Sequence, residues 1–186
     1  MKIVEKSDSG HTLVEFALLM PMLLIFVLGI VDFTRAIYDM EVITNLAGEG
    51  SAAASRETAN EFPATVAAIM LDADVNMTNN GCVVITSVSS TSSGTFQITA
   101  QSYSSPPPCN SATSKIGCFP PPSSCGTATI PTLVQQVLQS PSNTTSNTTY
   151  VAITEVYYNF TPITPIGSFL HSNSLLPTQL YAVAYY

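Results

Sequence analysis

The longest apolar run of the chain lies near its N-terminus. Phe16 to Val31 contains sixteen residues without a charge, and extension back to Leu13 gives nineteen residues interrupted only by Glu15. This length approaches the roughly 20 residues that an α-helix needs to cross the hydrocarbon core of a bilayer. The pattern therefore predicts a transmembrane helix over residues 11–31.

The helical pattern continues beyond this run. Apolar residues recur at steps of three and four, which places them on one helix face, at Phe33, Ile37, Met40, Ile43 and Ala47. Asp32, Arg35 and Asp39 lie off that face, at spacings that allow pairing along the helix. We therefore expect an amphipathic stalk helix over 32–59. The competing interpretation is a cleaved secretory signal peptide, which predicts a shorter apolar run that ends at a small-residue site.

The remaining residues, 60–186, change to short segments with strand-like alternation. We expect a helix from near Asn60, with Pro63 in its first turn, and a short helix over 130–139. A hairpin is predicted from two strands, at 82–89 and 95–103, and two further strands are predicted at 150–160 and 179–186. Loops are predicted at 104–129 and 141–148. The fold class is α+β: a long N-terminal helix packed on a small antiparallel sheet.

Charge is distributed unevenly over the 186 residues. Residues 1–61 hold four of the five Lys and Arg and nine of the twelve Asp and Glu, and the net charge is −7. Residues 60–186, which we call the head, therefore produce little long-range electrostatic field, and this argues against a nucleic-acid partner. The only bases before the apolar run are Lys2 and Lys6, and they favour a cytoplasmic N-terminus with the head outside.

Four cysteines lie in the low-charge head, three of them in the Pro/Ser-rich loop 104–129: Cys82, Cys109, Cys118 and Cys125. An even number of cysteines after a membrane anchor predicts disulfides formed in an oxidising compartment. Three pairings are open, and the alternative is one bridge with two free thiols. A zinc site is disfavoured, because the chain has no Cys-x-x-Cys and only two histidines.

Other candidate sites are weak. Asp72, Asp74 and Asn76 resemble the opening of a calcium loop, but Met77 and Val83 stand where Gly and Glu are required. We expect a helix exit and turn there, and neither a metal nor a cofactor. Asn-x-Ser/Thr glycosylation sequons occur at Asn76, Asn143, Asn147 and Asn159. Such sequons arise readily by chance in a Ser/Thr-rich sequence. His171 is the one candidate base in the head and has no acid near it in sequence, so we do not expect an enzyme.

Glu15 is the unusual residue of the apolar run, because ionisable groups in membrane helices are costly and usually functional. The segment from Gly10 to Phe16 resembles the prepilin peptidase site of type IV pilins and pseudopilins. This resemblance implies a leader over 1–10 that is cut after Gly10, with His11 as the new N-terminus. It assigns Glu15 and Phe16 to insertion into an assembly. The alternative is that Glu15 extends to the membrane interface without any role in assembly.

A longer resemblance is to the TadE-like family of Tad/Flp pilus assembly proteins. It rests on Val14 to Ala17, on Pro21 in the membrane helix, on Gly29 to Phe33, and on the small-residue segment from Ala47 to Arg56. Pro21 removes one helical hydrogen bond and is expected to kink the helix.

The resemblance implies a pilin-like minor pseudopilin in the bacterial inner membrane. Its implied partners are a prepilin peptidase, other pilins, inner-membrane assembly proteins and membrane lipid. A major filament subunit is the less favoured role, because the head is large for one. The alternative from another class is a single-pass anchored binding or adhesion module.

Overall fold

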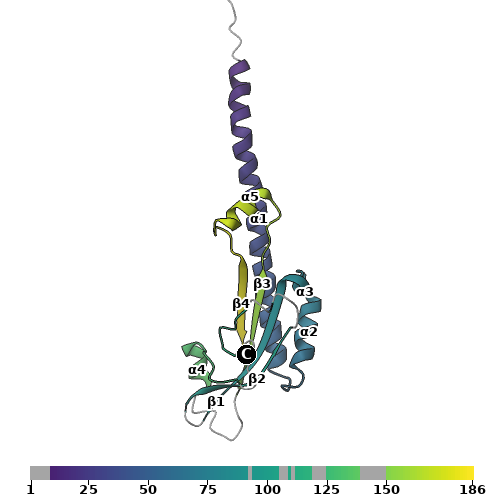
Figure 1. Ribbon diagram of the computed structural model, residues 1–186, viewed down its shortest axis with the longest axis vertical. Coiled ribbons are helices and arrows are strands. Elements are labelled where there is room, and N and C mark those ends of the chain that lie inside the picture. Colours follow the sequence, from purple (N-terminus) through teal and green to yellow (C-terminus); the bar gives the residue numbers. More distant parts are fainter. Residues whose placement is uncertain (1–8, 92–93, 105–108, 110–111, 119–124, 139–149) are drawn as a thin grey trace, which may run out of the picture. The chain divides into compact units, whose positions relative to one another are not determined.

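The computed structural model describes residues 9–91, 94–104, 109, 112–118, 125–138 and 150–186 (Figure 1). The chain forms two compact units. The first contains residues 1–37 and 161–178, and the second contains residues 38–160 and 179–186. The predicted loop 141–148, with its sequons at Asn143 and Asn147, lies outside the described residues, as does part of loop 104–129.

One helix, α1, extends over Ser9–Ala54 and contains 46 residues. It is long and apolar enough to cross a membrane, as the hydrophobic pattern predicts. Pro21 lies inside the helix, and the helix continues without interruption from the predicted span into the predicted stalk. The predicted span and the predicted stalk therefore differ in amino-acid composition at residues 31 and 32, whereas the helical backbone does not change there.

The first unit also contains α5 (Pro165–Ser172), which the sequence did not predict. Its start follows ordinary capping chemistry. The Thr164 hydroxyl accepts a hydrogen bond from the Gly167 N–H at 2.9 Å, and Pro165 occupies the first turn, where its missing N–H is not needed. At the other end, the Asn173 backbone N–H donates to the Phe169 carbonyl oxygen at 3.2 Å.

The second unit is built on a four-stranded antiparallel sheet of order β2-β1-β3-β4. The strands are β1 (Gly81–Ser90), β2 (Phe96–Tyr103), β3 (Tyr150–Asn159) and β4 (Gln179–Tyr185). The predicted hairpin and the two later strands are thus confirmed. The central strands β1 and β3 are buried along almost their whole length, so other parts of the protein cover both faces of the sheet.

Helices cover one face of this sheet. On this face, α2 (Phe62–Asp72) and α3 (Met77–Asn80) join the C-terminal part of α1. The fourth helix of this unit, α4 (Thr132–Leu138), belongs to the other face, where its Leu138 packs. A Cβ added to Gly50 of α1 would lie 2.8 Å from Ile69 Cδ1 of α2 and 2.9 Å from Thr154 Cγ2 of β3. Glycine at this position therefore lets α1 approach both the sheet and α2 closely.

The other face of the sheet carries the apolar core under the loops. Side chains alternate along a strand, so Val151 and Ile153 point away from the face that Thr154 shares with α1. They pack in a cluster whose further members are Val88, Phe96, Ile98, Ile116, Ile130 and Leu138. Ile116, Ile130 and Leu138, which lie between β2 and β3 in the chain, are therefore part of the core, although residues 104–129 were predicted to be a loop.

The buried face of α1 differs from the predicted one. Ile43 and Ala47 are fully buried as expected, but Phe33 and Ile37 are more than half exposed and Met40 is 38% exposed. The residues buried towards the N-terminal side of Ile43 are instead Asp32, Ala36 and Asp39. Apolarity alone selected the wrong side here, because a carboxylate can also be buried where hydrogen-bond donors reach it, as they reach Asp32.

Candidate functional site

The predicted processing and assembly residues lie at the start of α1. Within the described residues α1 extends from Ser9, so the predicted cleavage bond between Gly10 and His11 lies within helical backbone. Glu15 is exposed and lies among exposed apolar side chains, with Leu13 71%, Val14 58% and Phe16 58% accessible. A surface of this kind is stable only in lipid or against other apolar helices.

At the other end of the apolar run, Asp32 holds the start of α5. Its Oδ1 accepts from the Ile163 backbone N–H at 3.0 Å, and its Oδ2 accepts from the Thr164 backbone N–H at 3.2 Å. The Thr164 hydroxyl also donates to Oδ2. Asp32 is fully buried, so these three donors replace the water that a carboxylate requires.

The approach of α5 to Asp32 is close. A Cβ at Gly167 would overlap the Asp32 carboxylate, so only glycine fits there while the helix is docked. Arg35 supports the same turn, because its Nη1 donates to the Thr161 carbonyl oxygen at 3.5 Å. Asp32 was expected to lie off the buried face of α1, and it instead fixes α5 to α1.

In the second unit, the corresponding buried acid is Glu155, which has zero exposed area in the centre of β3. Its Oε1 lies 2.9 Å from the Lys115 backbone nitrogen, 2.9 Å from the Tyr157 hydroxyl and 3.0 Å from the Tyr181 hydroxyl. The Ser114 hydroxyl donates to Oε2. Glu155 therefore ties the loop 112–118 to the sheet.

Burial raises the pKa of Tyr157 and of Tyr181, and the Glu155 carboxylate raises each pKa further. Both phenols are therefore proton donors to Glu155 over the physiological range. The Lys115 Nζ lies 3.6 Å from the centre of the Tyr181 ring, which is a cation–π contact at the edge of this network. The arrangement stabilises the loop, and all of its donor groups are already used within the protein.

All four cysteines are paired in the structure. Cys82 bonds to Cys109, and Cys118 bonds to Cys125, with sequence separations of 27 and 7 residues. The first bridge joins β1 to the Pro-rich loop, and the second closes a short loop next to the segment that Glu155 holds. The alternative of two free thiols is thus wrong in this structure.

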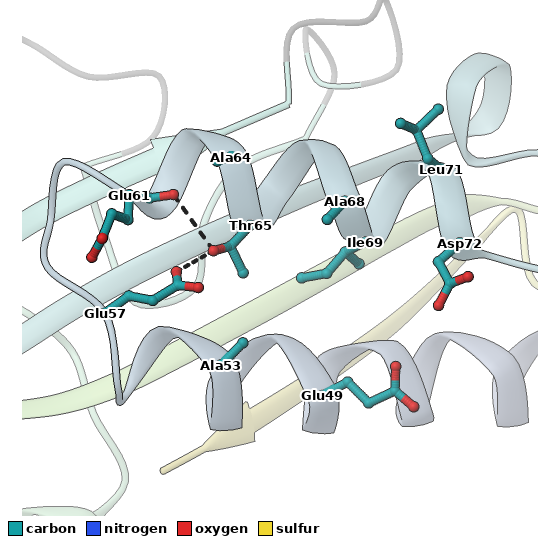
Figure 2. Close-up of a pocket in the computed structure, with 10 residues that line it drawn as sticks. All are labelled: Glu49, Ala53, Glu57, Glu61, Ala64, Thr65, Ala68, Ile69, Leu71 and Asp72. Atoms are coloured by element: carbon teal, nitrogen blue, oxygen red, sulfur yellow. Dashed lines mark hydrogen bonds between the residues drawn. The ribbon is translucent and has the colours of Figure 1, made fainter.

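A groove of about 820 Å³ lies between α1 and α2 (Figure 2). It is lined by Glu49 of α1, Asp72 of α2, and Glu57 and Glu61 of the connection between the two helices. Two of these carboxylates accept hydrogen bonds from nearby threonine residues. The Thr65 hydroxyl donates to Glu57, as Figure 2 shows, and the Thr58 backbone N–H donates to Glu61 Oε2 at 2.7 Å. The latter bond lowers the pKa of Glu61.

Neither the candidate calcium loop at Asp72 to Asn76 nor the candidate base His171 lies in a metal site within the described residues. Asn76 caps α3, because its Oδ1 accepts from the Asn79 backbone N–H at 3.3 Å, which fits the expected turn after Asp72 and Asp74. Within the described part of the chain, no group of three or more His, Cys, Asp or Glu is arranged to hold a metal ion. His171 lies in the last turn of α5.

The structural roles of the buried acids Asp32 and Glu155 were not predicted from the sequence. A signal was present for Glu155. It is the only charged residue in a strand-like run of ten, and an acid in the middle of a buried strand must receive several hydrogen bonds. Its donors come from a loop that is 40 residues away in sequence, and no local pattern reveals them.

Comparison with known proteins adds one match. Residues 10–52 fit the family model described as TadE-like protein, while no curated protein and no solved structure matches the chain. The match begins at Gly10 and covers Glu15, Pro21 and Asp32, which carried the resemblance in the sequence. Residues 10–52, which are 43 of the 186 residues, are thus similar to the TadE-like family, whose members are pilus assembly components.

Proposed function

We propose that this chain is a minor pseudopilin of a Tad (Flp-type) pilus or a related secretion machine. It is anchored by α1 in the bacterial inner membrane, with its N-terminus in the cytoplasm and its head outside. The observation that carries the proposal is the exposed Glu15 carboxylate in the otherwise apolar run of residues 13–31, five residues after Gly10.

The position of Glu15 gives the carboxylate a role in assembly. Cleavage after Gly10 by a prepilin peptidase creates an ammonium group on His11, about one helical turn from Glu15. In a bundle of such helices, Glu15 of one subunit neutralises the N-terminus of its neighbour. This pairing removes two isolated charges from lipid, where each is costly.

The stalk supports the same function. Phe33, Ile37 and Tyr38 are 60%, 54% and 51% exposed, although they lie beyond the apolar run. Large apolar side chains exposed outside the hydrocarbon core mark a protein–protein contact surface. Neighbouring pilin helices are the partners that continue this contact from the membrane into the stalk. Gly29 and Pro21, both within the span, leave room for adjustment of the helix during packing.

The first experiment determines the N-terminus of the mature protein in cells with and without an active prepilin peptidase. A chain that begins at His11 only when the peptidase is present supports the proposal. A chain that retains Met1 in both strains refutes it, and favours a single-pass anchored binding module. Gly10→Val is the matched variant, and we expect it to stay unprocessed at a normal level in the membrane.

The second experiment separates assembly from membrane anchoring. Glu15→Ala should leave the protein in the inner membrane but lower its recovery with isolated pilus assembly complexes. Glu41→Ala is the matched control, because Glu41 is an exposed acid on the same helix outside the span. Equal recovery of the two variants would show that Glu15 is no more than an interfacial side chain.

A further inference from the structure

We infer that α5 and the turn after it, residues 161–178, insert into the outer half of the membrane beside α1 and pack lipid acyl chains against their apolar side. The inference rests on the membrane anchoring of α1 in the proposed function. It concerns a different segment of the chain and a different partner, namely lipid.

The first observation is depth. Leu13 to Val31 is nineteen residues, or about 28 Å of helix, and this nearly fills the ~30 Å hydrocarbon core. Asp32 therefore lies at the outer boundary of the core. Its hydrogen bonds of 3.0 and 3.2 Å to Ile163 and Thr164 fix the start of α5 at the same depth.

The second observation is the direction in which the segment extends from Asp32. An apolar groove of about 500 Å³ is lined by Ile25, Gly29 and Phe33 of α1 together with Leu170, Leu175 and Leu176. Ile25 precedes Asp32 by seven residues, which is about 10 Å along the helix. The segment thus lies beside the outer third of the predicted span, within the ~5–10 Å that interfacial helices reach below the headgroups.

The third observation is composition. Residues 161–178 contain no Asp, Glu, Lys or Arg. Three large apolar side chains are nevertheless exposed in this segment, with Ile163 66%, Phe169 65% and Leu175 71% accessible. Exposure of such an apolar surface to water is unfavourable, whereas its burial among acyl chains is stabilising.

The fourth observation is that the backbone at both ends of α5 is satisfied locally, which insertion into a membrane requires. At the N-terminus, the Gly167 backbone N–H donates to the Thr164 hydroxyl oxygen at 2.9 Å. At the C-terminus, the Asn173 side-chain amide donates to the Phe169 carbonyl oxygen at 2.8 Å, and the Leu175 backbone N–H donates to the Leu170 carbonyl oxygen at 2.9 Å.

The chain contains no tryptophan, so a single introduced tryptophan reports one position without background. Phe169→Trp, Leu175→Trp, Phe26→Trp and Leu71→Trp are each made in the full-length protein and reconstituted in vesicles of phosphatidylethanolamine and phosphatidylglycerol. A brominated acyl chain in the same vesicles quenches tryptophans that reach the hydrocarbon. Phe26 tests the span, and Leu71 is the matched control, an 84% exposed apolar residue of the head.

We expect bromination to quench tryptophan at 26, 169 and 175, because positions ~5–10 Å below the headgroups contact acyl chains, and we expect tryptophan at 71 to keep its signal. Quenching at 26 without quenching at 169 or 175 overturns the inference while the anchor stands. An absence of quenching at 26 overturns the anchor as well. Quenching at 169 and 175 that disappears as the protein-to-lipid ratio rises shows that a second copy, and not lipid, covers the segment.

Discussion

Replacement of Asp32 by Asn tests how α5 is held on α1. The carboxylate uses both oxygens, one for the Ile163 N–H and one for the N–H and hydroxyl of Thr164. Asparagine has the same shape but only one acceptor oxygen. Whichever way the amide turns, its NH₂ group faces a backbone N–H that cannot reverse its polarity.

The magnitude follows from these contacts. Bonds to a charged acceptor contribute about 1.5–3 kcal/mol and neutral bonds about 0.5–1.5 kcal/mol, so the bond that remains weakens by roughly 1 kcal/mol. The donor that loses its acceptor is buried, and an unsatisfied buried donor costs about 1–3 kcal/mol. The free energy that holds α5 should fall by about 3 kcal/mol in total, or about 100-fold in the opening equilibrium.

Hydrogen exchange measured by mass spectrometry on the full-length protein in detergent reports this equilibrium. Amides of Ile163 to Gly167 should exchange about 100-fold faster in Asp32→Asn, while amides of β3 should keep their rates. Asp74→Asn is the control, because Asp74 is exposed and the same change of charge there should have no effect. Unchanged exchange at Ile163 to Gly167 would refute the role of Asp32.

Three further predictions concern the head. Glu155→Gln should lower the free energy of unfolding by about 2–3 kcal/mol, measured by denaturant titration with tyrosine near-ultraviolet signals, because its buried acceptors lose their charge. Since the pKa values of Tyr157 and Tyr181 are raised above 10 in the folded protein, the stability that they contribute is complete below pH 10 and is lost as pH rises through those values. Removal of the Cys82–Cys109 bridge, which closes a 27-residue separation, should lower stability by about 3.5 kcal/mol in thermal unfolding.

Each of these predictions has a control. Glu155→Gln should also move the phenolate titration to lower pH, since the negative charge is one cause of the raised pKa values, and an unmoved titration would contradict the proposed network. Replacement of both Cys118 and Cys125 should have a smaller effect, about 2.4 kcal/mol, because the separation is only 7 residues. A larger loss there than at Cys82–Cys109 would contradict the loop-closure reasoning.

The sequence predicted the secondary structure of the head well, because its strands alternate and its helix starts carry ordinary signals. Pro63 marks the first turn of α2, and the strand from Tyr150 was expected within one residue of its observed end. It did not predict α5, because eight residues with Pro and Gly at their start resemble a loop unless Thr164 is known to cap them. Capping geometry, unlike composition, is visible only in the structure.

What the sequence determined by itself is the long apolar helix with Glu15 near its start, since hydropathy over a membrane span depends on local residues alone. The tertiary structure decided which side of α1 is buried, how the cysteines pair, and why Asp32 and Glu155 are acids. A buried carboxylate is stable only when donors surround it, and those donors come from residues 131 and 40 positions away in the chain. No pattern along one helix or strand contains that information.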